Sequence, residues 1–166
     1  MSGDIVGTWD VSLSDGFYRI EFEHGTTTGK RVIYINGKEV LRRDWLFKLV
    51  GKETFPVGNT DTKATILIEA VTGFSYEYTL EINGKSLKTF LDNRSKISKT
   101  WALKLDDADY RIVLEKDTMD VWCNGQKMET MGEFTENGTE THFAVKRNGI
   151  VHSLLVDGIR IEEAIE

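Results

Sequence analysis

Histidine and cysteine are the side chains that most readily do chemistry, and this chain has few of them. Its histidines are His24, His142 and His152, and its single cysteine is Cys123. Imidazole and thiolate groups bind transition metals or act as bases and nucleophiles. The first question is therefore whether the fold brings any of these groups together.

The histidines lack the spacing of a metal site. His24 lies at the expected end of a strand, where a polar cap or a turn is its usual role. His142 and His152 flank the expected turn Asn148-Gly149. A loop with an even number of residues would place them on opposite faces of a sheet, and an odd loop would place them on one face. Because no cysteine or second histidine lies at zinc-ligand spacing, we expect no metal site.

The cysteine and the carboxylates give no catalytic pattern either. A reactive thiol needs a basic setting, whereas Cys123 has Asp120 nearby, so we expect a partly buried structural cysteine. Most carboxylates occupy the polar phase of expected strands, which is typical of solvated faces. Examples are Glu21, Glu23, Glu77 and Glu81. Since the chain also lacks a Gly-x-Ser-x-Gly elbow and a glycine-rich phosphate loop, we predict no catalytic residue, no cofactor and no enzyme activity.

The elements that position these residues follow from an internal repeat. Residues 8–24 read TWDVSLSDGFYRIEFEH, and residues 100–116 read TWALKLDDADYRIVLEK. Two further anchors recur in the same order, INGK with CNGQ and YTLEING with HSLLVDG, and the first copy has its main excess of length between Leu41 and Lys63. Such self-similarity indicates two copies of one unit. The recurring pairs Trp9/Trp101 and Tyr18/Tyr110 are expected in the cores.

Both copies read as antiparallel strands. Apolar and polar residues alternate, as at Trp9, Val11 and Leu13, which is typical of a strand with one face on a core. Dipeptides that favour type I′ hairpin turns separate the strands. They are Asn36-Gly37, Asn83-Gly84, Asn124-Gly125, Asn148-Gly149 and Asp157-Gly158. We predict an all-β protein of two antiparallel β-sandwiches or flattened barrels, each with about seven or eight strands.

Little or no helix is expected. The best helical candidate, Asp44–Lys52, has too few apolar repeats at helical spacing and ends near Gly51. Pro56 suits an edge strand or a loop. The segment 91–99 (LDNRSKISK) loses the alternation, so we predict domains at residues 1–92 and 99–166 with a linker at residues 93–98.

Basic residues gather around this expected linker. They are Lys85, Lys88, Arg94, Lys96, Lys99 and Lys104. They form either an ordinary solvated surface or a strip that binds the acidic second half or an acidic partner.

Composition excludes several classes of function. The net charge of −6 argues against nucleic-acid binding, which requires a basic face. No apolar run approaches the roughly 18 residues of a membrane span, so we expect no membrane insertion. The N-terminal residues lack the pattern of a signal peptide, and one cysteine cannot form an internal disulfide. We therefore expect a cytoplasmic protein.

Longer motifs resemble a known family. They are WDVSLSDG, IEFEHGTTTGKR, FKLVGKETF, TKATI, YEYTLEINGKSLK, RIVLEKDTMDVWCNG, and GEF followed by GTETHF. In these strings, from about Trp9 to the C-terminus, the chain resembles the Fas apoptotic inhibitory molecule family. The resemblance implies a cytosolic, non-enzymatic protein of two β-sandwich domains, associated with resistance to death-receptor-induced apoptosis and with protection against aggregation under stress. It implies no catalytic residues.

Two hypotheses follow for the function. In the first, the protein is a regulator that binds protein partners, either signalling components or aggregation-prone clients, through sheet edges and aromatic surface. In the second, it is a small-molecule carrier, since antiparallel barrels can hold a ligand. A cavity of about 300 Å³ or more in either copy would favour the carrier.

Overall fold

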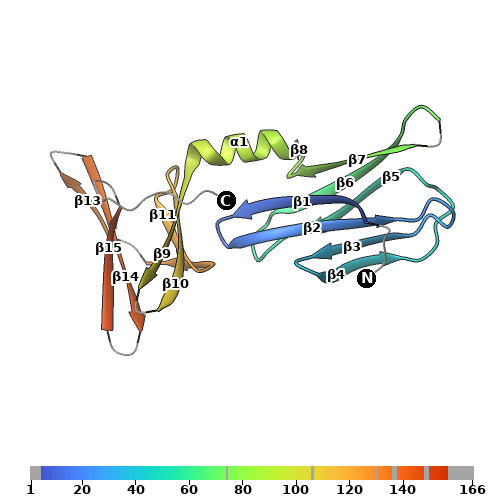
Figure 1. Cartoon of the computed structure of the whole chain (residues 1–166). Coiled ribbons are helices and arrows are strands. Elements are labelled where there is room, and N and C mark those ends of the chain that lie inside the picture. The colour runs from blue at the N-terminus through green and yellow to red at the C-terminus, as the bar shows by residue number, and fades with distance from the viewer. Residues whose placement is uncertain are drawn as a thin grey trace. The chain divides into compact units, whose positions relative to one another are not determined.

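The computed structural model describes residues 5–73, 75–105, 107–129, 131–135, 138–147 and 150–156. The chain divides into two compact units, Met1–Arg94 (unit 1) and Ser95–Glu166 (unit 2). Strands make up most of both units among the described residues (Figure 1). The prediction of an all-β protein is confirmed.

Unit 1 contains two four-stranded antiparallel sheets, with strand orders β1-β2-β3-β4 and β5-β6-β7-β8. The strands of the first sheet are β1 (Ile5–Leu13), β2 (Gly16–His24), β3 (Arg31–Ile35) and β4 (Lys38–Arg43). The strands of the second are β5 (Gly51–Pro56), β6 (Lys63–Ala70), β7 (Tyr76–Ile82) and β8 (Lys85–Ser86). Both sheets are open, so unit 1 is a sandwich rather than a barrel. Pro56 ends the edge strand β5, as expected.

One core lies between these two sheets. The first sheet contributes Val11, Leu13, Ile20, Phe22 and Ile33, and the second contributes Phe55, Ala64, Ile66, Ile68, Leu80 and Ile82. These side chains belong to the inward phase of strands that alternate. Each large one contributes roughly 1.5–3 kcal/mol by its burial. Trp9 and Tyr18 pack against this cluster, which confirms their expected place.

The hairpins turn where the Asn-Gly dipeptides predict. Asn36, Asn83 and Asn124 have φ angles of 52°, 51° and 49°, and each following glycine is also at positive φ. Type I′ turns require this conformation at both central residues. Ile82 pairs with Lys85 across the second turn. The dipeptides Asn148-Gly149 and Asp157-Gly158 lie outside the described residues.

One helix interrupts the strands in the described part of the chain. Helix α1 (Leu87–Ile97) starts after Ser86, whose Oγ accepts a hydrogen bond from the Thr89 backbone N–H at 3.3 Å, the usual N-cap contact. Leu87 and Phe90 pack against the unit 1 core. Residues 93–98, expected as a linker, form the end of α1 and the first residue of β9. Residues 44–50, within the best helical candidate, are irregular.

Unit 2 contains a four-stranded and a three-stranded sheet, with orders β12-β11-β10-β9 and β13-β14-β15. Its strands are β9 (Ser98–Leu105), β10 (Ala108–Glu115), β11 (Asp120–Cys123), β12 (Gln126–Met128), β13 (Met131–Thr135), β14 (Gly138–Arg147) and β15 (Ile150–Val156). Tyr110, Ile112, Leu114, Val121 and Cys123 form its described core, and Trp101 packs against it. A common origin of the two units stays a prediction.

In the part of the chain that the structure describes, no helix is both long and apolar enough to cross a membrane.

Candidate protein-binding loop

The connection between β4 and β5, residues 44–50, presents two aromatic side chains to solvent. Trp45 is 63% exposed and Phe47 is 91% exposed. Their ring centroids lie 6.2 Å apart at an interplanar angle of 62°, an edge-to-face contact. We call residues 44–50 the aromatic loop. Contiguous exposed apolar surface can mark an interaction site, so we take this pair as the candidate site.

The backbone of the aromatic loop is tied to the sandwich at several points. The Leu46 N–H donates to the Thr28 carbonyl at 2.9 Å. The Arg31 guanidinium donates to the carbonyls of Lys48 and Val50 at 3.2 and 2.9 Å. These bonds restrain the backbone of the aromatic loop, which lowers the entropic cost of ordering the loop when a partner binds.

Gly29 adds a steric condition to this arrangement. It has a φ of 75°, in the left-handed region, and its Cα lies so close to the Leu46 carbonyl that a Cβ would overlap it. Only glycine meets both conditions without strain. The turn before β3 and the aromatic loop therefore pack together only with glycine at this position.

A buried charge cluster lies beneath the loop. Arg31 and Glu53 are each 5% exposed, and Arg31 Nη1 lies 3.0 Å from Glu53 Oε2. Arg43 reaches the same carboxylate through Nε, 2.7 Å from Oε2, and through Nη2, 3.1 Å from Oε1. Two arginines thus neutralise and hydrogen-bond one buried carboxylate. Burial would raise the pKa of Glu53, but the hydrogen bonds from Arg43 and Arg31 outweigh it and lower that pKa.

His24 lies at the end of β2, as expected, but it is buried rather than part of a turn. It is 4% exposed, and its Nδ1 lies 2.6 Å from the Tyr78 hydroxyl. Its ring packs edge-on against Tyr76 and Tyr78, with centroids 5.3 and 5.4 Å away. Burial lowers the pKa of His24, and the positive charge of Arg31 lowers it further. The histidine is therefore held neutral near pH 7.

The other histidines are separated by the strand register. β14 and β15 pair His142 with Leu155 and His152 with Val145. Since Arg147 pairs with Ile150, the connection has an even length, and the two histidines occupy positions of opposite phase. Among the described residues, no group of three or more metal-binding side chains comes together.

Cys123 is buried, and burial raises the pKa of its thiol.

The prediction for Glu23 is wrong, because this carboxylate is 1% exposed rather than solvated. Lys30 Nζ lies 3.2 Å from its Oε2. Lys30 lies in the β2–β3 connection, and its ammonium pairs with a carboxylate that alternation alone assigns to solvent.

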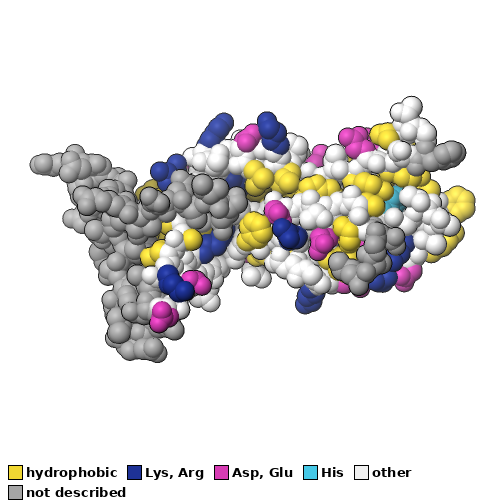
Figure 2. Space-filling model, in the orientation of Figure 1, with side chains coloured by type: hydrophobic (Ala, Val, Ile, Leu, Met, Phe, Trp, Pro, Cys, Tyr) yellow, Lys and Arg dark blue, Asp and Glu magenta, His cyan; other side chains and the backbone are white. Residues whose placement is uncertain are grey.

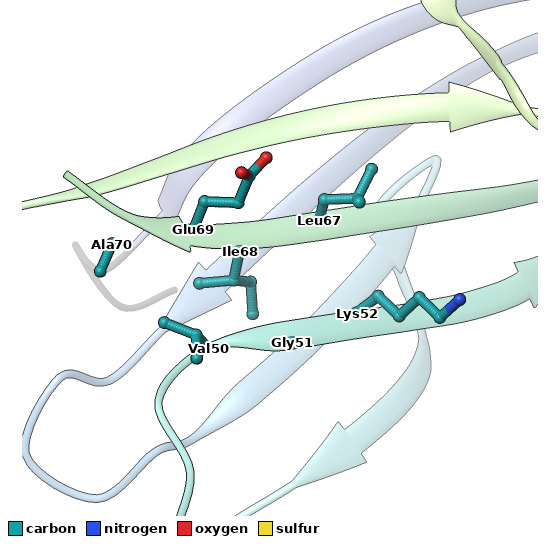
Figure 3. A pocket seen from close by; sticks show the side chains of 7 residues that line it. All are labelled: Val50, Gly51, Lys52, Leu67, Ile68, Glu69 and Ala70. Carbon is teal, nitrogen blue, oxygen red and sulfur yellow. The ribbon is translucent and has the colours of Figure 1, made fainter.

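A hollow on the second sheet of unit 1 has a volume of about 590 Å³. Figure 3 shows its lining side chains on and beside the adjacent strands β5 and β6. They are Val50, Gly51, Lys52, Leu67, Ile68, Glu69 and Ala70. It exceeds the size that would favour a carrier, but it opens to solvent and its lining includes the charged Lys52 and Glu69. An enclosed apolar site would bury most of its ligand, and this hollow does not.

Comparison with known proteins decides the family. The family model for Fas apoptotic inhibitory molecule (FAIM1) matches residues 5–164. This chain belongs to the FAIM1 family. It is 62% identical over 174 residues to Fas apoptotic inhibitory molecule 1 of Mus musculus, with 96% of this chain and 97% of the mouse protein covered. The protein of the same name from Homo sapiens is 58% identical with the same coverage, and the one from Bos taurus is 60% identical over 98% of this chain and 88% of its own length.

The aromatic loop of this FAIM1 family member was not identified from the sequence. A signal was present, since Trp45-Leu46-Phe47 lies between Arg42-Arg43 and Lys48 in a segment that is neither alternating nor helical. Apolar residues in such a segment normally indicate a buried loop or a strand. Only the structure shows that Leu46 is half-buried beside the turn at Gly29 while the flanking rings are exposed.

Proposed function

We propose that this protein is a non-enzymatic cytoplasmic regulator that protects cells against death-receptor-induced apoptosis and stress-induced protein aggregation by binding other proteins. Its relatives are named Fas apoptotic inhibitory molecule 1, which supports the apoptotic part of the proposal. Neither the family name nor the names of the relatives refers to a catalytic activity.

The observation that carries the proposal is the exposed pair Trp45 and Phe47 on a restrained loop. Tryptophan is enriched among the residues that dominate binding energy at protein interfaces. The hydrogen bonds from Arg31 fix the loop before any partner arrives. Aromatic side chains at such a position can anchor an apolar segment of a signalling protein or of an unfolded client.

The chemistry-bearing groups of unit 1 also support a binding role. His24 contacts Tyr78, and Glu53 is shared by Arg31 and Arg43. Each of these groups has a partner that explains its place as part of the sandwich. The surface of unit 1 mixes apolar and charged side chains, and Figure 2 shows apolar ones reaching it at several places.

The double variant Trp45→Ala/Phe47→Ala tests the proposal in vitro. Wild-type protein is expected to delay light scattering by insulin with reduced disulfides at an equimolar ratio. The variant should bind this client at least about tenfold more weakly, because truncated anchor residues cost binding energy of this size. Phe17→Ala is the matched control, since Phe17 is an exposed aromatic residue (41%) on β2. Equal protection by wild type, variant and control would contradict the role of the loop, and no delay by wild type would contradict client binding.

The same variants test the apoptotic part in cells that carry the Fas receptor. Expression of the wild type and of Phe17→Ala should lower caspase activation after receptor cross-linking, and the double variant should do so less. All three proteins must be present at equal levels, measured by immunoblot. Full activity of the double variant would show that the aromatic loop is not the surface used in this pathway.

A further inference from the structure

The edges of the two sheets of unit 1 are protected to different degrees. β1 has a bulge in which Val6 is the extra residue between the pairs Ile5–Glu23 and Gly7–Phe22. β4 has one in which Val40 is the extra residue. Bulges interrupt the row of backbone groups that another strand would need.

The edge strand β5 uses other devices. It ends in Pro56, which has no N–H to donate, and Glu53 points inward, where it is buried. Proline and inward-pointing charges are known means of preventing strand addition at an edge. Three of the edge strands described in unit 1 are thus blunted.

The outer edge of β7 has no such device between Tyr76 and Leu80. β8 pairs with β7 only at Glu81 and Ile82. The chain then leaves the sheet because Ser86 caps α1. β8 therefore occupies only the first positions along this edge of β7. The rest of the edge, from Leu80 back to Tyr76, has no paired strand in the described structure.

The direction of the backbone groups follows from the hairpin. The Asn83 N–H donates to the Lys63 carbonyl, so the backbone of Asn83 faces β6 and that of Ile82 faces β8. Because backbone groups alternate along a strand, Tyr76, Tyr78 and Leu80 direct their N–H and C=O away from β6. Among the described residues, no ladder or other backbone hydrogen bond reaches these outward groups.

The outer face of β7 presents a carboxylate beside another carboxylate, with no ion pair to either among the described residues. Glu77 lies directly opposite Glu69 of β6, and both side chains are exposed. Like charges directly opposite one another destabilise a sheet. A basic side chain on a third strand, opposite Glu77, would relieve this repulsion. That position is of the non-hydrogen-bonded type, where side chains lie closest.

The side chains that face the core beside the free edge of β7 are largely apolar. Tyr76 and Tyr78 pack against the core from β7, and Leu87 and Phe90 do so from α1. β1 and β7 come close to each other (Figure 1), and apolar side chains reach the surface on this side of unit 1 (Figure 2). A strand added at β7 would place its inward side chains near this apolar region.

We infer that the edge of β7 from Tyr76 to Leu80 binds an extended segment of another protein as an additional antiparallel strand, with apolar residues on the inward phase and a basic residue opposite Glu77. This inference rests on the proposed function, and it names the class of segment that a client or partner contributes. Main-chain hydrogen bonds supply the affinity, and the charge opposite Glu77 supplies the specificity.

The test uses the full chain and two acetylated peptides, one alternating Val and Lys and one alternating Val and Glu. Binding is followed by the NMR signals of the backbone amides, together with their hydrogen exchange. The Val/Lys peptide should shift and protect the amides of Tyr76, Tyr78 and Leu80. Glu77→Lys should weaken its binding about fivefold and favour the Val/Glu peptide, as expected for the loss of one cross-strand charge pair.

Glu81→Lys is the matched control. It changes the net charge by the same amount on the same face of β7, but Ser86 of β8 already lies opposite it. This variant should change the affinity by less than about twofold. Equal effects of both variants, absence of peptide binding, or protection confined to the amides of β4 would each overturn the inference. Protection of the β7 amides that rises with protein concentration in the absence of peptide would also overturn it, because it would mean that β7 pairs with a second copy of the chain.

The outcomes separate this inference from the proposed function. Suppose that the Trp45→Ala/Phe47→Ala variant fails to protect insulin, that Glu77→Lys protects it fully, and that no peptide binds at β7. The proposed binding function would then stand, and the strand-addition site would be ruled out. Loss of protection in neither variant would remove both.

Discussion

The first hairpins of the two units are built alike, and the connections that follow them are not. β1–β2 pairs Trp9 with Ile20, and β9–β10 pairs Trp101 with Ile112, the corresponding residues of the repeat. After the fourth strand, unit 1 uses residues 44–50 to reach β5, whereas in unit 2 β12 ends at Met128 and β13 begins at Met131. The shared part forms a core, and the added length in unit 1 carries the exposed aromatic rings.

A second difference concerns buried charge. In unit 1, Glu23 is buried beside Lys30, and Glu53 is buried beneath the aromatic loop. In unit 2, Glu115, the counterpart of Glu23, accepts a hydrogen bond from Trp122 Nε1 at 2.6 Å. A buried charge is destabilising unless its partner is kept, so these carboxylates restrict the structure of unit 1 in addition to its apolar core. Of these carboxylates, Glu53 is linked to the aromatic loop, because its partner Arg31 donates to the carbonyls of Lys48 and Val50.

Among the substitutions that compare the two units, Glu53→Ala is expected to lower the free energy of unfolding of unit 1 the most. Removal of the carboxylate leaves Arg31 buried without its counter-ion, which typically costs about 3–5 kcal/mol. The free energy of unfolding of unit 1, measured by urea titration, should fall by this amount. Glu39→Ala removes an exposed partner of Arg42 and should cost less than about 1 kcal/mol. Equal small effects in both variants would show that the cluster does not stabilise unit 1.

Matched core substitutions compare the two units directly. Ile20 is fully buried in unit 1 and Ile112 is 2% exposed in unit 2. Ile20→Ala and Ile112→Ala should each cost about 2–5 kcal/mol through lost burial and a residual cavity. Urea unfolding followed by tryptophan fluorescence measures both. A cost below 1 kcal/mol for only one of them would mean that the repeated positions are not equivalent.

Acidification should affect unit 1 more than unit 2 through His24, whose counterpart in the repeat is Lys116. The pKa of His24 is lowered in the folded state, first by burial and then by Arg31. The unfolded state therefore binds more protons below about pH 6.5, so stability is lost as the pH falls from there toward the lowered pKa. His24→Gln should remove this part of the pH dependence of unfolding, and an unchanged profile would contradict the assignment.

Much of the strand structure could be predicted, because it depends on local signals. The alternation and the Asn-Gly turns act within a few residues, and Asn36, Asn83 and Asn124 adopt the expected conformation. Helix α1 was missed although Ser86 is an N-cap residue and Leu87, Phe90 and Leu91 have helical spacing. Its charged and polar remainder resembles a linker, and only packing of Leu87 and Phe90 on the sandwich distinguishes the two.

The charge cluster beneath the aromatic loop could not be predicted for a different reason. Arg31, Arg43 and Glu53 come from three strands and two sheets, and nothing in their spacing shows that they meet. Alternation assigns such residues to solvent, as it did incorrectly for Glu23. Long-range pairing of charges depends on how the two sheets are stacked, which the sequence pattern does not specify.

We propose that unit 1 binds partners through the aromatic loop, and the indole N–H signals of the four tryptophans give the sharpest test of this role. Titration of the full chain with reduced insulin should shift or broaden the signal of Trp45, while the signals of Trp101 and Trp122 in unit 2 stay unchanged. A response at Trp101 or Trp122 with none at Trp45 would show that the aromatic loop is not the binding surface.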